Sequence, residues 1–109
     1  MTIHWGLLLS VQLLIKNKMS INLTFCSGVG SVTGANFLLE LSNGDKTTKI
    51  LVDCGLIQGE KSAQAENRDD FGYDPEEIDM LFVTHAHLDH VGRIPKLVKE
   101  GFNGVIYST

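Results

Sequence analysis

Apolar and polar residues alternate in short runs along the chain, and this pattern predicts an α/β fold in which strands predominate. Residues 21–26 alternate with the period of two that is typical of a half-buried strand. The Asn43-Gly44 pair separates two further apolar runs and is typical of a hairpin turn. We expect five strands, at residues 21–26, 36–41, 47–52, 78–83 and within 103–109.

Helical segments are expected only in the second half of the chain. Residues 74–77, Asp-Pro-Glu-Glu, combine a capping aspartate with a first-turn proline and predict a short helical turn. Residues 91–100 carry apolar side chains at helical spacing, with Pro95 at the start of a helix or at a kink, and Gly101 as its end. The polar residues 56–73 predict an irregular, solvated connection.

The first eighteen residues differ from the rest. Their apolar run, residues 5–15, is too short to span a bilayer, and positive charge follows it instead of preceding it as in a secretory signal. We therefore expect residues 1–18 to be a non-native or disordered extension, with Met19 as the natural start. Residues 19–109 then form a portion of one domain, and no membrane association is predicted.

Composition is that of a globular domain. The 109 residues are 43% hydrophobic and 20% charged. The net charge of −4 gives no basic footprint of the kind that marks nucleic-acid binding, although a local groove or a metal ion can supply positive potential. Cys26 and Cys54 form no CxxC pair, so we expect buried, reduced thiols and a cytoplasmic protein.

Candidate chemistry is concentrated directly after the predicted strand 78–83. Three of the four histidines of the chain, His85, His87 and His90, fall in one hexapeptide together with Asp89. Imidazole and carboxylate ligands suit zinc and similar divalent ions. If the segment leaves the strand extended, His85 and His87 project to the same side and can hold one ion, with Asp89 and His90 placed for a second.

Two other polar features accompany the hexapeptide. The loop 28–34 contains three glycines but lacks the lysine of a phosphate-binding P-loop, which favours a structural turn. Asp53 ends an apolar strand, where an unpaired buried carboxylate would be costly. It either caps the strand end through a local turn or orients nearby metal ligands.

The motif His-x-His-x-Asp-His resembles the metal-binding signature of the metallo-beta-lactamase superfamily. Its surroundings resemble one branch, the beta-CASP RNA-processing nucleases. The similarity covers roughly residue 20 to the C-terminus, and three further pieces match in order: 28–34 (Gly-Val-Gly-Ser-Val-Thr-Gly), 50–59 (Ile-Leu-Val-Asp-Cys-Gly-Leu-Ile-Gln-Gly) and 92–102.

The resemblance implies a fold and a chemistry. The fold would be the N-terminal part of an αββα sandwich, truncated before the later metal ligands. Its metals would be two zinc ions held by His85, His87, Asp89 and His90, and Asp89 and Asp53 would have catalytic roles, Asp53 by orienting ligands. The reaction would be phosphodiester hydrolysis in RNA, single-stranded RNA being the expected partner, and the complete protein could be a homodimer.

Several alternatives remain open at this stage. Thioester or lactone hydrolases of the same superfamily use the same hexapeptide. A non-catalytic metal-binding module fits a chain that holds only part of a ligand set, and such a chain would expose apolar sheet surface and aggregate. Arg93 could face a phosphate, but a solvated position on a helix is the preferred interpretation.

Overall fold

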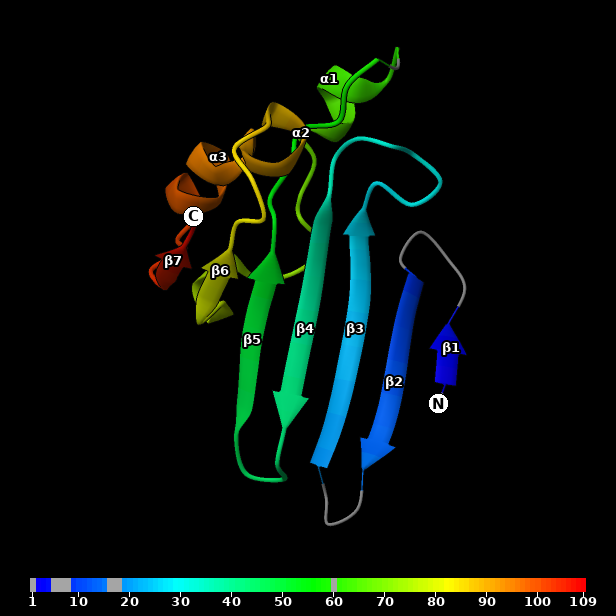
Figure 1. Cartoon of the computed structure of the whole chain (residues 1–109), viewed down its shortest axis with the longest axis vertical. Helices are drawn as coiled ribbons and strands as arrows, with labels where there is room; N and C mark the ends of the chain where they lie inside the picture. Colours follow the sequence, from blue (N-terminus) through cyan, green and yellow to red (C-terminus); the bar gives the residue numbers. More distant parts are fainter. Residues whose placement is uncertain (1, 5–8, 16–18, 60) are drawn as a thin grey trace.

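The computed structural model describes residues 2–4, 9–15, 19–59 and 61–109. Its described strands form one mixed sheet in the order β1 to β7, and the chain adds each strand next to the one before it (Figure 1). The strands are β1 (Thr2–His4), β2 (Leu9–Ile15), β3 (Met19–Ser27), β4 (Asn36–Ser42), β5 (Thr47–Val52), β6 (Met80–Phe82) and β7 (Val105–Tyr107).

The direction of pairing changes at β5. Strands β1 to β5 are antiparallel neighbours, and the predicted hairpin turn joins β4 to β5, closed by the Asn43 amide donating to the carbonyl of Lys46 at 3.1 Å. Strands β5, β6 and β7 are parallel, so Val52, Phe82 and Tyr107 lie side by side at their carboxyl ends. All five predicted strands are present, and β6 is shorter than expected because Ile78 caps the preceding helical turn.

Strands β1 and β2 lie within the segment that the sequence marks as an extension. Leu9–Ile15 pairs antiparallel with β3 along its whole length, and Thr2–His4 pairs with β2. The backbone of these two ranges is therefore part of the sheet. Whether residues 1–18 belong to the natural product stays a prediction.

The α-helices lie near the carboxyl ends of β5 and β6, at the upper end of the sheet in Figure 1, whereas a 3-10 helix precedes β6. The predicted turn at residues 74–77 is a 3-10 helix, η1 (Pro75–Glu77), capped by the Asp74 side chain accepting from the Glu76 amide at 2.9 Å. The helix predicted at residues 91–100 corresponds to α3 (Ile94–Lys99), with Pro95 in its first turn, and a separate short helix that was not predicted, α2 (Leu88–Val91), precedes it. Among the described residues, no helix has both the length and the apolarity to cross a membrane.

The segment 56–73 is not the solvated, irregular connection that its polarity predicts. It contains a one-turn helix, α1 (Ala63–Glu66), and buries Ile57, Ala63 and Phe71. Three apolar residues separated by charged ones have neither helical nor strand period, which is why pattern alone missed them. Phe71 packs in the main core with the described buried residues Leu38, Leu51, Cys54, Ile78, Leu81, Leu97 and Phe102.

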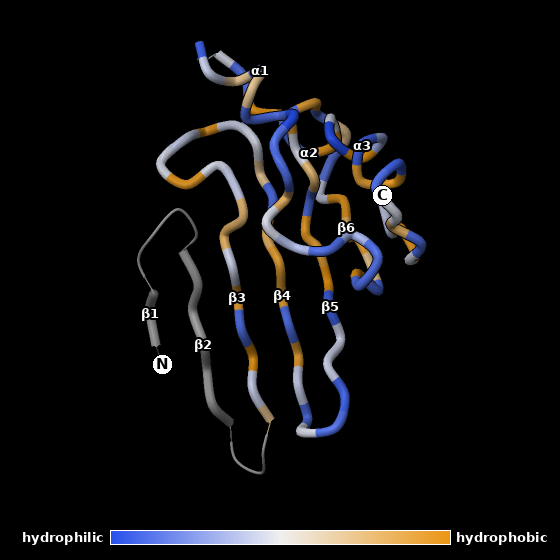
Figure 2. Tube along the Cα trace, turned by 180° about the vertical axis from the view of Figure 1, so that it is seen from behind, coloured by the Kyte–Doolittle hydropathy of each residue, from blue (hydrophilic) through white to orange (hydrophobic). Residues whose placement is uncertain are grey.

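The core lies between the sheet and the helices. In Figure 2 hydrophobic residues are concentrated in the parts of β4 and β5 nearest the helices. The last strand is different, because Val105, Ile106 and Tyr107 are all exposed, and Tyr107 stacks on the exposed Phe82 with ring centroids 4.9 Å apart. The expectation of exposed apolar sheet surface is therefore met at β6 and β7.

Candidate functional site

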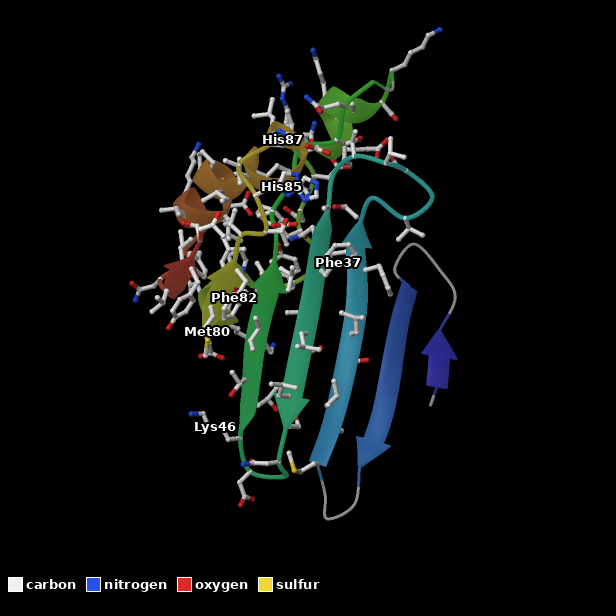
Figure 3. The ribbon with its side chains drawn as sticks, in the orientation of Figure 1. Phe37, Lys46, Met80, Phe82, His85 and His87 are labelled. Carbon is white, nitrogen blue, oxygen red and sulfur yellow. The ribbon has the colours of Figure 1, made fainter. Side chains whose placement is uncertain are left out.

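The histidine hexapeptide, residues 85–90, follows β6 and continues into α2, directly above the carboxyl ends of the parallel strands (Figure 3). His85 and His87 come from the non-helical residues before α2, where the backbone of His87 is extended (φ −70°, ψ 147°), and their ring centroids are 4.8 Å apart. Asp89 and His90 come instead from α2, for which His87 is the N-terminal cap position. This helical turn brings the His90 ring to 3.9 Å from that of His85, centroid to centroid.

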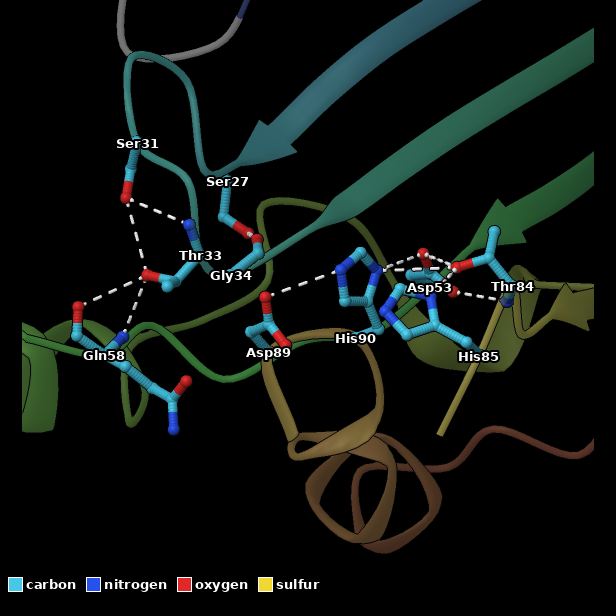
Figure 4. A network of polar contacts seen from close by, with 10 residues as sticks. All are labelled: Ser27, Ser31, Thr33, Gly34, Asp53, Gln58, Thr84, His85, Asp89 and His90. Atoms are coloured by element: carbon cyan, nitrogen blue, oxygen red, sulfur yellow. Dashed lines mark hydrogen bonds and ion pairs between the residues drawn. The ribbon is translucent and has the colours of Figure 1, made fainter. Parts of the chain in front are cut away.

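Asp53 lies under the histidines and is almost fully buried, with 1% of its surface exposed. Its Oδ1 accepts from the Thr84 amide at 2.8 Å, and its Oδ2 lies 2.7 Å from both the Thr84 hydroxyl and His90 Nδ1 (Figure 4). The side chain reaches these partners because the backbone of Asp53 turns into the left-handed region, with φ +60°. Its place beside the hexapeptide agrees with the predicted orienting role, which stays a prediction.

The backbone of Asp53 is held by partners that sequence reasoning missed. Its amide donates to the Phe82 carbonyl at 2.8 Å, and its carbonyl accepts from Asn36 Nδ2 at 2.9 Å. The Tyr73 hydroxyl in turn donates to Asn36 Oδ1 at 3.1 Å, and burial raises the pKa of that phenol. The sequence signal for this support is an asparagine at the start of an apolar strand, and the structure shows that Asn36 is fully buried there.

Helix α2 is attached to the strand ends through its main chain. The carbonyls of Leu88, Asp89 and His90 accept from the amides of Leu56, Ala35 and Cys54 at 2.9–3.1 Å. The Asp89 and His90 carbonyls are among those that a short helix leaves without internal partners at its C-terminal end, whereas the Leu88 carbonyl also accepts from the Gly92 amide at 2.8 Å. The two candidate ligands on α2 are thus fixed to the segment that carries Asp53.

The glycine-rich loop forms the neighbouring rim. Gly28, Gly30 and Gly34 all have φ between +73° and +79°, which explains their use in a tight turn. The Ser27 hydroxyl donates to the Gly34 carbonyl and closes the loop. A cavity of about 220 Å³ lies between this loop and His90, so the structural turn also borders the candidate site.

Arg93 is buried, with 5% of its surface exposed, and the preferred interpretation of a solvated helix residue is wrong. Its Nε donates to the Gly55 carbonyl at 2.6 Å and its Nη2 to the Ser27 hydroxyl at 2.8 Å, while the guanidinium lies over the Phe71 ring at 5.2 Å. The arginine therefore joins the segment after β5 to the start of the glycine-rich loop. Its five donors in a fixed fork suit this structural role.

The donor types of the site fit a divalent metal, but their arrangement is only part of a ligand set. Three imidazoles and a carboxylate converge, and His90 Nε2 lies 3.4 Å from Asp89 Oδ2. Within the part of the chain that the structure describes, however, no group of three or more His, Cys, Asp or Glu side chains is positioned to hold one ion. The ligand roles of His85, His87, Asp89 and His90 stay predictions.

Comparison with known proteins shows to which family the chain is related. The model of the metallo-beta-lactamase superfamily matches residues 32–109. A ribonuclease of Thermus thermophilus, Ribonuclease TTHA0252, is 50% identical over 78 residues, which are 72% of this chain and 17% of that protein. Transcription termination factor FttA of Methanococcus maripaludis is 45% identical over 65 residues, 57% of this chain and 10% of that protein.

A eukaryotic protein is also similar. Cleavage and polyadenylation specificity factor 73 of Drosophila melanogaster is 40% identical over 65 residues, 59% of this chain and 9% of that protein. The chain spans less than a fifth of the length of these relatives. They confirm the resemblance to RNA-processing nucleases that the motifs predicted, and the α/β fold class is confirmed as well. The chain belongs to the metallo-beta-lactamase superfamily.

Proposed function

We propose that the protein containing this sequence is a metal-dependent hydrolase that processes RNA by cleaving phosphodiester bonds. The observation that carries the proposal is the 50% identity, over 78 residues, to a protein named as a ribonuclease. The superfamily match over residues 32–109, which contains Asp53 and the histidine hexapeptide, agrees with it. The site supports it by gathering three imidazoles and two carboxylates at the carboxyl ends of parallel strands, where α/β folds commonly bind ligands.

His85 and His87 would hold one zinc ion, and Asp89 and His90 would contribute to a second. Bound zinc supplies Lewis-acid chemistry, which activates water and stabilises charge on phosphate oxygens. Asp53 accepts from His90 Nδ1 and so fixes the ring with Nε2 directed towards Asp89. Ligand-orienting carboxylates of this kind typically affect metal affinity or activity about tenfold to a hundredfold.

The substrate would be single-stranded RNA, and the complete protein could act as a homodimer. A cytoplasmic location is part of the proposal because Cys26 and Cys54 are free thiols. A second candidate is a metal-binding module without catalysis, because the gathered imidazole and carboxylate donors would serve ion binding alone as well.

The deciding experiment uses the natural protein that contains this sequence. Cleavage of single-stranded RNA and of a thioester would be measured with zinc, after chelation and after zinc is restored, with His87→Ala as the ligand variant. The proposal expects RNA cleavage that chelation and His87→Ala both abolish. Cleavage of the thioester but not of RNA would assign the protein to another branch of the superfamily. Zinc binding without either activity would favour the metal-binding module.

A further inference from the structure

Thr84 directly precedes His85, two residues after the end of β6, and its side chain contacts three members of the candidate site. Its Oγ1 lies 2.7 Å from Asp53 Oδ2, 3.0 Å from His85 Nδ1 and 3.5 Å from His90 Nδ1 (Figure 4). Its main-chain amide donates to the other carboxylate oxygen, Asp53 Oδ1, at 2.8 Å. The hydroxyl is therefore the link between the buried carboxylate and the first histidine of the hexapeptide.

The direction of these hydrogen bonds follows from the number of protons available. A hydroxyl has one proton to donate and two lone pairs, whereas an ionised carboxylate only accepts. At 2.7 Å from Asp53 Oδ2, the Thr84 hydroxyl donates to the carboxylate. Its contact with His85 Nδ1 must then be donated by the ring, so the proton of neutral His85 resides on Nδ1. The lone pair is left on Nε2.

We propose that Thr84 is a positioning residue that holds His85 in the Nδ1–H tautomer and so presents Nε2 to a metal ion. The inference rests on the proposed function only in taking zinc as the ligand. Asp53 imposes the same tautomer on His90 directly, because His90 Nδ1 lies 2.7 Å from Oδ2. The buried Asp53 carboxylate thus orients two imidazoles: that of His90 directly, and that of His85 through the Thr84 hydroxyl.

The chemistry explains why this position carries a hydroxyl on a branched side chain. Two substituents on Cβ restrict the first side-chain torsion, which keeps the hydroxyl aimed at the carboxylate. Valine has the same shape without the hydroxyl, so Thr84→Val removes the link while preserving volume. Thr84→Ser keeps the hydroxyl and should restore the link.

The test reads the tautomer in the metal-free chain by nuclear magnetic resonance. Chemical shifts of the ring nitrogens in ¹⁵N-histidine-labelled protein, at an alkaline pH where imidazoles are neutral, report which nitrogen carries the proton. We expect Nδ1–H for His85 in the wild type and in Thr84→Ser, and a mixture of tautomers in Thr84→Val. Thr48→Val, the same change on β5 and away from the histidines, should leave the His85 shifts unchanged.

Zinc affinity provides the second measurement. By competition with a chromophoric chelator, Thr84→Val should bind zinc about tenfold to a hundredfold more weakly, and Thr84→Ser within a few-fold of the wild type. A wild-type His85 that carries its proton on Nε2 would overturn the proposal. So would a Thr84→Val protein that retains both the wild-type tautomer and the wild-type zinc affinity.

Asp53→Asn keeps the proposal testable if Thr84→Val does not fold. The Thr84 amide holds an oxygen at the Oδ1 position, so the new amide group would stand at the Oδ2 position and donate to Thr84 Oγ1 and to His90. The hydroxyl would then donate to His85, and both rings should change to Nε2–H. Retention of Nδ1–H on both rings would contradict the link. These readouts involve no RNA, so a failure of RNA cleavage would not mimic either result.

Discussion

Gly55 packs so closely against Asp89 that a Cβ placed on the glycine would stand 1.7 Å from the Asp89 carbonyl oxygen. Real Cβ atoms essentially never approach other atoms to less than 3.0 Å, so no side chain fits here. The contact lets Ala35 and Cys54 donate to the Asp89 and His90 carbonyls on either side of it. The absence of a side chain at Gly55 is therefore what allows α2 to lie against the end of β5.

The first prediction follows from this contact. Gly55→Ala should displace α2 from the end of β5, because the Asp89 backbone of α2 must move to make room for the added methyl group. We expect a loss of about 1–3 kcal/mol in the free energy of unfolding, typical of an overpacked site, measured by chemical denaturation. The amide resonances of Asp89 and His90 should shift, and zinc affinity should fall because the two candidate ligands on α2 move with the helix.

Gly30→Ala is the matched control. Gly30 has φ +75° and no atom within 4 Å of an added Cβ, so alanine there costs only backbone strain, about 1–2 kcal/mol. It should destabilise the protein without moving the α2 resonances. If Gly55→Ala left those resonances unchanged, the close contact would not be what positions the helix.

The second prediction concerns Arg93. Arg93→Lys keeps the charge but cannot donate to both the Gly55 carbonyl and the Ser27 hydroxyl in the same geometry. Because hydrogen bonds from charged groups contribute about 1.5–3 kcal/mol, we expect a loss of roughly 2 kcal/mol in the free energy of unfolding. Arg68→Lys, the same change at an exposed position, should alter stability by less than about 0.5 kcal/mol. Equal effects of the two variants on the free energy of unfolding would show that the hydrogen bonds of Arg93 to Gly55 and Ser27 do not stabilise the protein.

The strands could be predicted because their signals are local. The apolar runs, the Asn43-Gly44 turn and the Asp74-Pro75 start each depend on neighbouring residues, and each corresponds to an element of the structure. The position of Asp53 beside the histidines is the one that the family resemblance implied, whereas the cost of an unpaired carboxylate alone left a local cap of the strand end open.

Other features depend on contacts between distant segments. Arg93 follows Gly92 in a polar turn, and nothing near it in sequence shows that Gly55 and Ser27 lie within reach. The burial of Phe71 likewise depends on the packing of the segment 56–73 across the core. Thr84 is next to His85 in the sequence, but its role can be inferred only from its distances to Asp53 and His85 in the structure.

The third prediction concerns alkaline stability. Burial raises the pKa of the Cys54 thiol from 9.0 to about 11, so in the unfolded chain the thiol loses its proton at lower pH than in the folded protein. As pH rises from about 9 to 11 the folded state then binds more protons than the unfolded state, and stability must fall with rising pH. Below pH 9 the thiol is protonated in both states and contributes no pH dependence.

Denaturation of Cys54→Ala between pH 7 and pH 11 measures this linkage. The variant should lose stability at pH 7 through the cavity it creates, but its decline above pH 9 should be shallower than that of the wild type, by up to roughly 1 kcal/mol per pH unit. Parallel curves for the two proteins would exclude Cys54 as a source of alkaline instability. Cys26, whose pKa burial raises to about 12, accounts for part of the decline that remains.

The fourth prediction concerns self-association through the exposed strand β7. Ile106 is 44% exposed on an edge strand with Val105 and Tyr107, and exposed apolar edge strands pair with other chains. A lysine at this position opposes edge pairing, so Ile106→Lys should reduce the fraction of large species in light scattering while leaving the denaturation midpoint within error. Ser108→Lys adds the same charge at an exposed position without removing an apolar side chain, and should reduce association less. If both variants suppressed association equally, net charge rather than the apolar edge would be the cause, because added like charge alone keeps proteins apart.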